Sequence, residues 1–338
     1  MKQLILAAGI ALAPLALWAQ TKADMVGDVV NHHILPRYAA LAATSDKLAA
    51  TAQTDCEANS ETLRRAYDSA FDAWIAVSHL RFGPSEVNNR AFALAYWPDS
   101  RGATPKTLAA LIADADPAAN TADSFSEVSI AGRGFYALEF LLYDDQLSTM
   151  GSADYRCTLV KAVTADIAVQ SRAILDDWQQ GYGDMLLSPS DTSPYRSTEE
   201  VAQELFKALN VGLEFTADTR IGRPMGTFDR PRPTRAEAWR SGRSLRNVVL
   251  SLNSLEDLAL RLSQSDPALT EKFRNGFAHA AEIAAQLDDP VFAGTADPQS
   301  RLRIEVLQQA VADIRSIANT DLGPLLGVAS GFNALDGD

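Results

Sequence analysis

The chain has 338 residues, and its 43 acidic side chains outnumber its 30 lysines and arginines, which gives a formal net charge of −13. This acidic balance excludes nucleic acid and anionic lipid surfaces as principal partners, because both are recognised by clustered basic side chains. A chain of this length can bury a large core, either as one large domain or as two halves.

The first nineteen residues have the pattern of a secretory signal peptide. Lys2 precedes an apolar stretch that is too short to span a bilayer and is interrupted by Pro14. Residues 17–19 form an acceptable cleavage site, and no cysteine that could carry a lipid lies beside it. We therefore predict that residues 1–19 are removed on export. The remainder is expected to be a periplasmic protein that is not a lipoprotein and has no membrane span.

Apolar side chains recur at spacings of three and four along most of the remaining chain, whereas alternating strand-like runs are almost absent. This periodicity is typical of amphipathic helices. Ser60 and Thr198, each followed by acidic residues, are predicted to mark helix starts, and Thr104 is a predicted N-cap. Pro36 is expected to kink the first helix or to begin a new one. The pattern predicts an all-α fold. We expect helices at residues 22–53, 58–82, 84–94, 105–114, 130–143, 153–186, 198–221, 235–263, 267–287 and 298–320.

A loop rich in serine and proline at residues 188–196 is the clearest boundary in the chain. It separates a predicted N-terminal helical half, residues 20–187, from a C-terminal half, residues 197–338. Residues 81–84 and 220–224 both run through Arg, an apolar residue, Gly and Pro, the second with one arginine inserted. This similarity fits either a duplicated bundle or two ordinary helix stops. We therefore predict two helical-bundle halves packed together and leave a pseudo-two-fold duplication open.

Cys56 and Cys157 are the two cysteines of the chain. In an exported protein a disulfide between them is expected, and the alternative is two buried free thiols. The bond would close a loop of about a hundred residues and stabilise the fold by about 4 kcal/mol in the loop-entropy model. Because the chain lacks CxxC and Cys/His zinc spacings, a structural zinc site is not expected.

Residues 131–143 contain one carboxylate, Glu139, in an otherwise apolar helical run. A buried carboxylate is normally paired, ligated or protonated, and we expect an arginine to compensate this one. Arg133, Tyr136 and Glu139 are three residues apart and are predicted to share one helix face. Helical bundles build sites on such polar faces. The alternative is a purely structural Arg–Glu pair beside a buried tyrosine.

Residues 220–246 carry a dense group of arginines in an otherwise acidic chain. The planar guanidinium group suits carboxylates and phosphates. The arginines could pair with acids such as Glu139, Asp99 and Glu237, or they could hold an anionic ligand such as a ferric chelate or an acidic sugar. The members are Arg220, Arg223, Arg230, Arg232, Arg235, Arg240, Arg243 and Arg246.

Catalytic signatures are sparse, since the chain has no HExxH, no GxSxG and no phosphate-binding glycine-rich loop. His32 and His33 are adjacent, so only one of them can face a given side of a helix. Either could be a ligand, or both could have surface or cap roles. His79 is interpreted as a polar rim residue, and His279 as part of a surface pair with Glu282.

Several short motifs, in their order along the chain, resemble the imelysin-like family of exported, two-bundle helical proteins. The family motif is Gly-x-His-x-x-Glu, and here Gly134 and Glu139 match while Tyr136 replaces the histidine. A phenol is a poor ligand for zinc or ferrous iron, although a phenolate can bind ferric iron. The other matching segments are Pro36 with Tyr38, Trp74 to Pro84, Trp97-Pro98-Asp99, Gly134 to Leu142, Arg220 to Gly226, and Arg240-Ser241 with Ser244.

The resemblance implies a ligand site at the junction of the two bundles and a role tied to iron uptake. Tyr136 and Glu139 are the candidate metal ligands, and iron is the implied cofactor. The first hypothesis is a non-enzymatic periplasmic component of iron acquisition that binds a metal ion, an anionic metal chelate or other envelope iron-uptake proteins. The alternatives are a metal-dependent peptidase and a binding protein for anionic carbohydrate. The candidate binding residues are Arg81, Asp99, Arg133, Tyr136, Glu139, Arg223, Arg240, Ser241 and Ser244.

Overall fold

The computed structural model describes residues 22–328. Within that range the fold is all-α, and the β-structure is limited to one isolated bridge between Thr227 and Arg230. The predicted signal peptide, residues 1–19, lies outside the described residues. Among the helices that are described, none combines the length and the apolar character needed to cross a bilayer.

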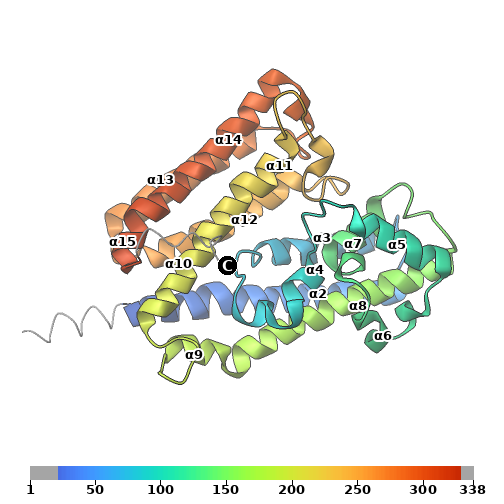
Figure 1. The fold of residues 1–338 in the computed structure, drawn as a ribbon, viewed down its shortest axis with the longest axis horizontal. Coiled ribbons are helices and arrows are strands. Elements are labelled where there is room, and N and C mark those ends of the chain that lie inside the picture. Colours follow the sequence, from blue (N-terminus) through green and yellow to red (C-terminus); the bar gives the residue numbers. More distant parts are fainter. Residues whose placement is uncertain (1–21, 329–338) are drawn as a thin grey trace, which may run out of the picture.

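The helices follow the predicted order closely along most of the chain (Figure 1). The longer ones are α2 (Leu35–Thr54), α3 (Glu61–Ile75), α5 (Ala103–Asp114), α7 (Gly134–Tyr143), α8 (Ala153–Asp177), α10 (Thr198–Glu214), α12 (Ser244–Leu262), α13 (Pro267–Gln286) and α14 (Pro298–Ile317). The short ones are α4 (Arg90–Leu94), α6 (Ala122–Ser126), α9 (Gly183–Leu187), α11 (Gly222–Met225) and α15 (Gly323–Leu326).

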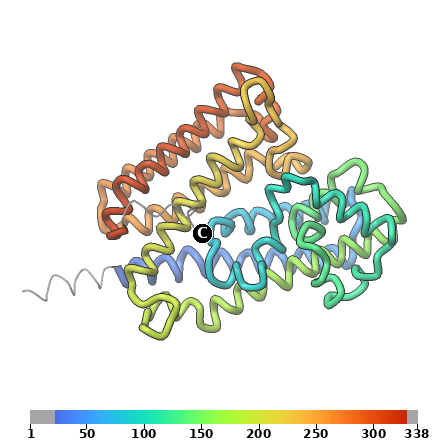
Figure 2. Tube along the Cα trace, viewed as in Figure 1, coloured from blue at the N-terminus to red at the C-terminus, as the bar shows by residue number. Residues whose placement is uncertain are grey.

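The helices form two groups that lie side by side (Figures 1 and 2). In the first group, α2 packs against α3 and α8, and α7 packs against α8. In the second group, α12 packs on α13, α13 on α14, and α10 on both α12 and α14. The loop at 188–196 lies between α9 and α10. The division into two domains at this loop and a duplication of one from the other stay predictions.

Several helices continue through a π-helical turn, the wider helical form that is rare and often found at functional sites. Two of these turns matter below: η1 (Val30–Ile34), which precedes α2, and η7 (Phe215–Ile221), which follows α10. Pro36 lies in the first turn of α2, where its missing N–H costs no helical hydrogen bond. The predicted kink near Pro36 is thus a change of helix type directly before it.

Several predicted helices are wrong in part. The helix predicted at 84–94 is replaced by two short 3₁₀ turns followed by α4, with Asn88 and Asn89 at positive φ. The helix predicted at 58–82 ends at Ile75 and is followed by turns, and the helix predicted at 235–263 begins only at Ser244. Within 235–263, Ala238 and Gly242 have positive φ values of 49° and 72°, which a right-handed helix cannot contain. The helix predicted at 130–143 is interrupted at Arg133, whose backbone is extended, and α7 starts after it.

The predicted helix starts at Ser60 and Thr198 are correct, whereas the predicted N-cap Thr104 is wrong. Ser60 accepts a hydrogen bond from the backbone N–H of Leu63 and caps α3, as expected. Thr198 is the first residue of α10, as predicted, and Ser197 before it is the capping residue. For α5 the N-cap position is Gly102 and not Thr104. Small polar residues cluster at these helix starts, so the sequence identifies the start but not the capping side chain.

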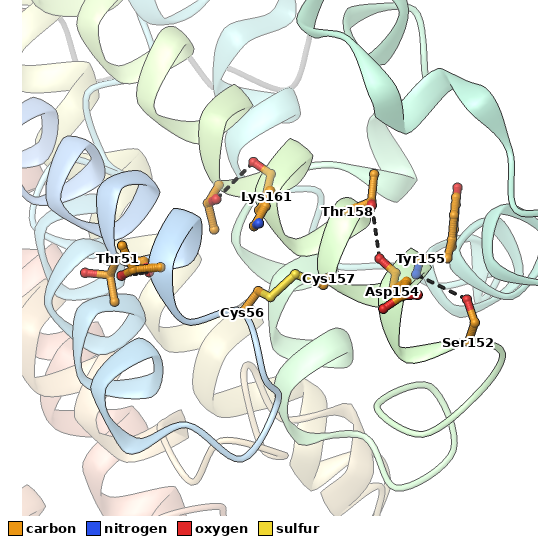
Figure 3. The surroundings of a disulfide bond; sticks show 10 residues. Thr51, Cys56, Ser152, Asp154, Tyr155, Cys157, Thr158 and Lys161 are labelled. Atoms are coloured by element: carbon orange, nitrogen blue, oxygen red, sulfur yellow. Dashed lines mark hydrogen bonds between the residues drawn. A yellow bond between two sulfur atoms is a disulfide. The ribbon is translucent and has the colours of Figure 1, made fainter.

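The disulfide between Cys56 and Cys157 is present, which confirms that prediction (Figure 3). The two Cα atoms lie 5.1 Å apart and are separated by 101 positions in the chain. Cys56 follows the end of α2 and Cys157 lies near the start of α8. The bond therefore joins two helices that also pack along their length.

Candidate functional site

The helix that carries the family-like motif begins with a glycine that cannot be replaced without strain. Gly134 has a φ of 75°, and a Cβ atom built on it would lie 2.2 Å from the backbone oxygen of Leu94. Glycine is the residue that tolerates both the positive φ and the close approach. The start of α7 is therefore held against the end of α4, which fixes where the rest of α7 points.

Arg133 does not share a face with Tyr136 and Glu139, contrary to the prediction. Its extended backbone turns the side chain away from α7, and its Nε and a terminal nitrogen donate to the two carboxylate oxygens of Asp166 at 3.0 and 2.6 Å. The other terminal nitrogen donates to the backbone oxygen of Ser126 at 2.7 Å. Arg133 is thus satisfied in a structural ion pair outside the candidate site.

Tyr136 and Arg220 share one buried carboxylate. The hydroxyl of Tyr136 donates to Oε1 of Glu237 at 2.5 Å, and Nε of Arg220 donates to Oε2 at 2.8 Å. A terminal nitrogen of Arg220 also donates to the hydroxyl of Ser78 at 3.0 Å. Arg220 and Glu237 are 3% and 1% exposed, so this is a fully desolvated ion pair of the second helix group, to which Tyr136 and Ser78 of the first group are hydrogen-bonded.

Burial raises the pKa of Tyr136 well above 10, and the negative charge of Glu237 raises it further. The positive charge of Arg220 opposes this effect only in part. The phenol is therefore held in its protonated form, because a phenolate would lie beside a carboxylate without water. This environment works against the ferric phenolate that the sequence left open.

Glu139 is buried, as predicted, but an arginine is not its direct partner. Oε1 accepts hydrogen bonds from both the backbone N–H and the hydroxyl of Ser241, each at 2.9 Å. Burial raises the pKa of Glu139, and the two Ser241 donors together with the charge of Arg240 act in the opposite direction. Arg240 itself binds Asp144 at 2.8 Å and lies over the ring of Phe140.

An aromatic wall connects Tyr136 to the arginine-rich segment. The ring of Trp97 stacks on Tyr136 with centroids 6.1 Å apart and meets Phe215 edge-on at 5.8 Å. On Trp97 lies the guanidinium of Arg223, 5.9 Å from the ring centroid. Sequence analysis placed Trp97 in a matching motif but did not identify it as a site residue, because tryptophan spacing carries no signal of its orientation.

Two predicted site residues have local roles instead. Arg81 pairs with Glu86 at 2.7 Å. Asp99 accepts from the backbone N–H groups of Ala103 and Thr104 at 2.9 and 2.8 Å, so it caps the start of α5. These backbone donors lower the pKa of Asp99 against the effect of burial. Neither residue is hydrogen-bonded or ion-paired to Tyr136 or Glu139.

Ser244 lies in the first turn of α12, and its buried hydroxyl has no hydrogen-bond partner among the described residues. The side-chain amide of Asn247, on the next turn, is unpartnered in the same way, and so is the hydroxyl of Tyr67. Such groups are rare in native proteins. The charges of Glu139 and Arg243 both act on the pKa of Tyr67, so this hydroxyl borders the candidate site.

A second buried polar cluster was missed from the sequence. Nδ1 of His33, in η1, is 2.7 Å from a carboxylate oxygen of Asp257 in α12, and its Nε2 is 2.9 Å from Nε2 of His79. His79 is 5% exposed, so its interpretation as a rim residue is wrong. His33 and His32 face different sides, as expected, and His32 is exposed. Only the tertiary fold brings positions 33, 79 and 257 together.

The His33 cluster predicts a loss of stability in mild acid. Burial lowers the pKa of His33 from 6.5 to about 4, with Arg37 contributing and Asp257 opposing. Below pH 6.5 the unfolded chain binds this proton and the folded chain does not. The contribution of His33 is therefore present at neutral pH and is lost as the pH falls toward 4, by about 3 kcal/mol in total.

Urea unfolding of the wild type and His33→Gln between pH 7 and pH 4 measures this effect. We expect the free energy of unfolding of the variant to fall less steeply with decreasing pH. His32→Gln is the matched control, since it removes an exposed histidine from the adjacent position. Parallel curves for wild type and His33→Gln would contradict the prediction.

Residues 22–328 contain no group of three or more His, Cys, Asp or Glu side chains placed to hold a metal ion. A cleft of about 540 Å³ lies elsewhere, between α5 and the segment 116–129, and is lined by Lys106, Asp114, Asp116 and Glu127 among others. It does not include Tyr136 or Glu139.

The family model described as Imelysin matches residues 34–318. The chain belongs to the imelysin family. Two solved structures share the imelysin fold with it. One is an imelysin-like protein from Psychrobacter arcticum 273-4, with 22% identity, a TM-score of 0.78, and 97% of this chain and 100% of that chain covered.

The second structure is a candidate iron-regulated protein A precursor from Parabacteroides distasonis ATCC 8503. It is 16% identical with a TM-score of 0.73, and the match covers 91% of this chain and 95% of that chain. At these identities the likeness concerns the fold alone. Comparison with curated proteins gave no match.

Within this imelysin fold the side chains at the motif positions are hydrogen-bonded to other residues of the same chain. The position of the family histidine is Tyr136, which donates to Glu237, and the family glutamate is Glu139, which accepts from Ser241. Both partners come from residues 237–241, the irregular segment directly before α12. The chemistry offered here is hydrogen bonding and ion pairing across the two helix groups.

Proposed function

We propose that this imelysin-family protein is a non-enzymatic, periplasmic binding component of iron acquisition, with its ligand site at the junction of the two helix groups. The observation that carries the proposal is the protonated Tyr136, which donates to Glu237 where a metal-binding histidine would need a free nitrogen. Family membership and the iron-regulated description of one structural neighbour support the link to iron.

Tyr136 and Glu139 do not fit a bare metal ion. The phenol is a donor, and its pKa is raised by burial and by Glu237. The Oε1 atom of Glu139 already accepts two hydrogen bonds from Ser241. Catalytic zinc typically needs three protein ligands and an open position for water. We therefore propose that the protein binds a metal chelate or a partner protein.

The alternative function, a metal-dependent peptidase, predicts metal-dependent cleavage of unfolded protein, whereas the non-enzymatic proposal predicts none. Hydrolysis needs a metal-activated water and a base, so we expect no cleavage of unfolded protein substrates above background with added zinc or iron. The assay compares the wild type with Tyr136→His, which restores the family motif, and with Glu139→Gln. Metal-dependent cleavage by the wild type that Glu139→Gln abolishes would overturn the non-enzymatic assignment.

A further inference from the structure

Arg223 and Arg235 lie on two short elements that pack against each other. Arg223 belongs to α11, and Arg235 ends the short 3₁₀ turn η8 (Pro233–Arg235). Burial and the positive charge of Arg235 both lower the pKa of Arg223. Two cations held together repel each other, so the arrangement favours a counter-anion between or beside them.

Within residues 22–328, neither of these guanidinium groups forms an ion pair or a hydrogen bond. Arg223 differs in this respect from other buried or half-buried arginines of the segment, because Arg220 binds Glu237, Arg240 binds Asp144, and Arg243 binds Asp68. In a chain with a net charge of −13, unpaired neighbouring arginines are unexpected. Carboxylates are plentiful in this protein, yet none compensates this pair.

Arg223 supplies an independent observation. Its Nε is buried and has no hydrogen-bond partner among the described residues, while its guanidinium lies over the ring of Trp97. Stacking on an aromatic face leaves the in-plane N–H donors of a guanidinium free. A planar acceptor can meet those donors two at a time. The ring of Trp97 also stacks on Tyr136, so Arg223 lies beside the candidate site.

We propose that Arg223 and Arg235, backed by Trp97, form a binding site for a small anion that carries carboxylate groups. A polycarboxylate, free or as its ferric chelate, matches two adjacent guanidinium groups better than a single compact charge does. This inference rests on the proposed function and adds the chemical class of its ligand. Ring stacking between Trp97 and Tyr136 connects this proposed anion site to the candidate functional site.

Calorimetric titration of the mature chain with citrate, ferric citrate, galacturonate and inorganic phosphate tests the site. We expect citrate to bind, and Arg223→Gln and Arg235→Gln each to weaken binding about tenfold or more, as loss of a charged hydrogen-bonding partner should. Higher ionic strength should weaken binding to the wild type. The matched control is Arg230→Gln, which removes an exposed arginine without an ion pair from the same segment.

Three outcomes would overturn the site. They are no binding of citrate, ferric citrate or galacturonate at up to about 10 mM, an equal loss in Arg230→Gln, and tighter binding of phosphate than of any carboxylate. Arg235 is exposed, so Arg235→Gln tests the site even where Arg223→Gln alters the fold. Equal binding of citrate and ferric citrate, or a preference for galacturonate, would support the anion site at Arg223 and Arg235. Either result would contradict the proposed role in iron acquisition.

Discussion

Replacing Glu237 with alanine is expected to lower the free energy of unfolding by about 3 to 5 kcal/mol, because it leaves the buried charge of Arg220 without a partner. Arg220 is 3% exposed, and its remaining contacts, such as the one to Ser78, are hydroxyl groups that cannot neutralise it. The same change also removes the acceptor of the Tyr136 hydroxyl. Urea unfolding followed by circular dichroism gives the loss.

The matched control is a double replacement, Arg220→Met with Glu237→Leu, which removes both charges. Apolar side chains of similar size often replace buried ion pairs at little cost, so this variant should be more stable than Glu237→Ala. Tyr136→Phe separates the part due to the phenol and should cost about 1 kcal/mol. A loss of less than about 1 kcal/mol in Glu237→Ala would show that Arg220 reaches water.

Removing the disulfide by changing Cys56 and Cys157 to serine is expected to lower the free energy of unfolding by about 4 kcal/mol in the loop-entropy model. The effect is large because the bond closes a loop spanning 101 positions, which restricts the unfolded chain strongly. The measurement is urea unfolding of the double variant and of the oxidised wild type.

Reduced wild-type protein is the control for the serine hydroxyls, and it should match the double variant within about 1 kcal/mol. The stability of the double variant should not depend on reductant, because it has no disulfide to break. A loss of under 1 kcal/mol on breaking the bond, with an unchanged denaturant slope, would mean that α2 and α8 restrain the unfolded chain without it.

The all-α fold could be predicted because the buried face of each amphipathic helix appears in the sequence as apolar residues at spacings of three and four. Along α3, Leu63, Tyr67, Phe71 and Trp74 recur at spacings of three and four, and all of them are buried. The error at 235–243 has a physical reason. Ala238 has a positive φ of 49°, which ends any helix there, although alanine otherwise favours helix.

The candidate site was predictable in part. The burial of Glu139 follows from its apolar neighbours, since a carboxylate inside such a run must lie in the core. Its partner does not follow, because Ser241 is 102 positions away and is brought near by the packing of the two helix groups. The pairing of Arg133 with Asp166 was hidden for a similar reason, because it depends on where α7 begins.

The irregular backbone before α12 determines which donors the buried acid can use. Inside an α-helix the N–H of Ser241 would be bonded to the carbonyl group four residues earlier, and it would be lost to Glu139. Because the chain is not helical at residues 236–243, this N–H is available and meets the carboxylate. Strong helix formers in this segment would therefore compete with the fold, because a higher helix propensity here would remove a hydrogen-bond donor from Glu139.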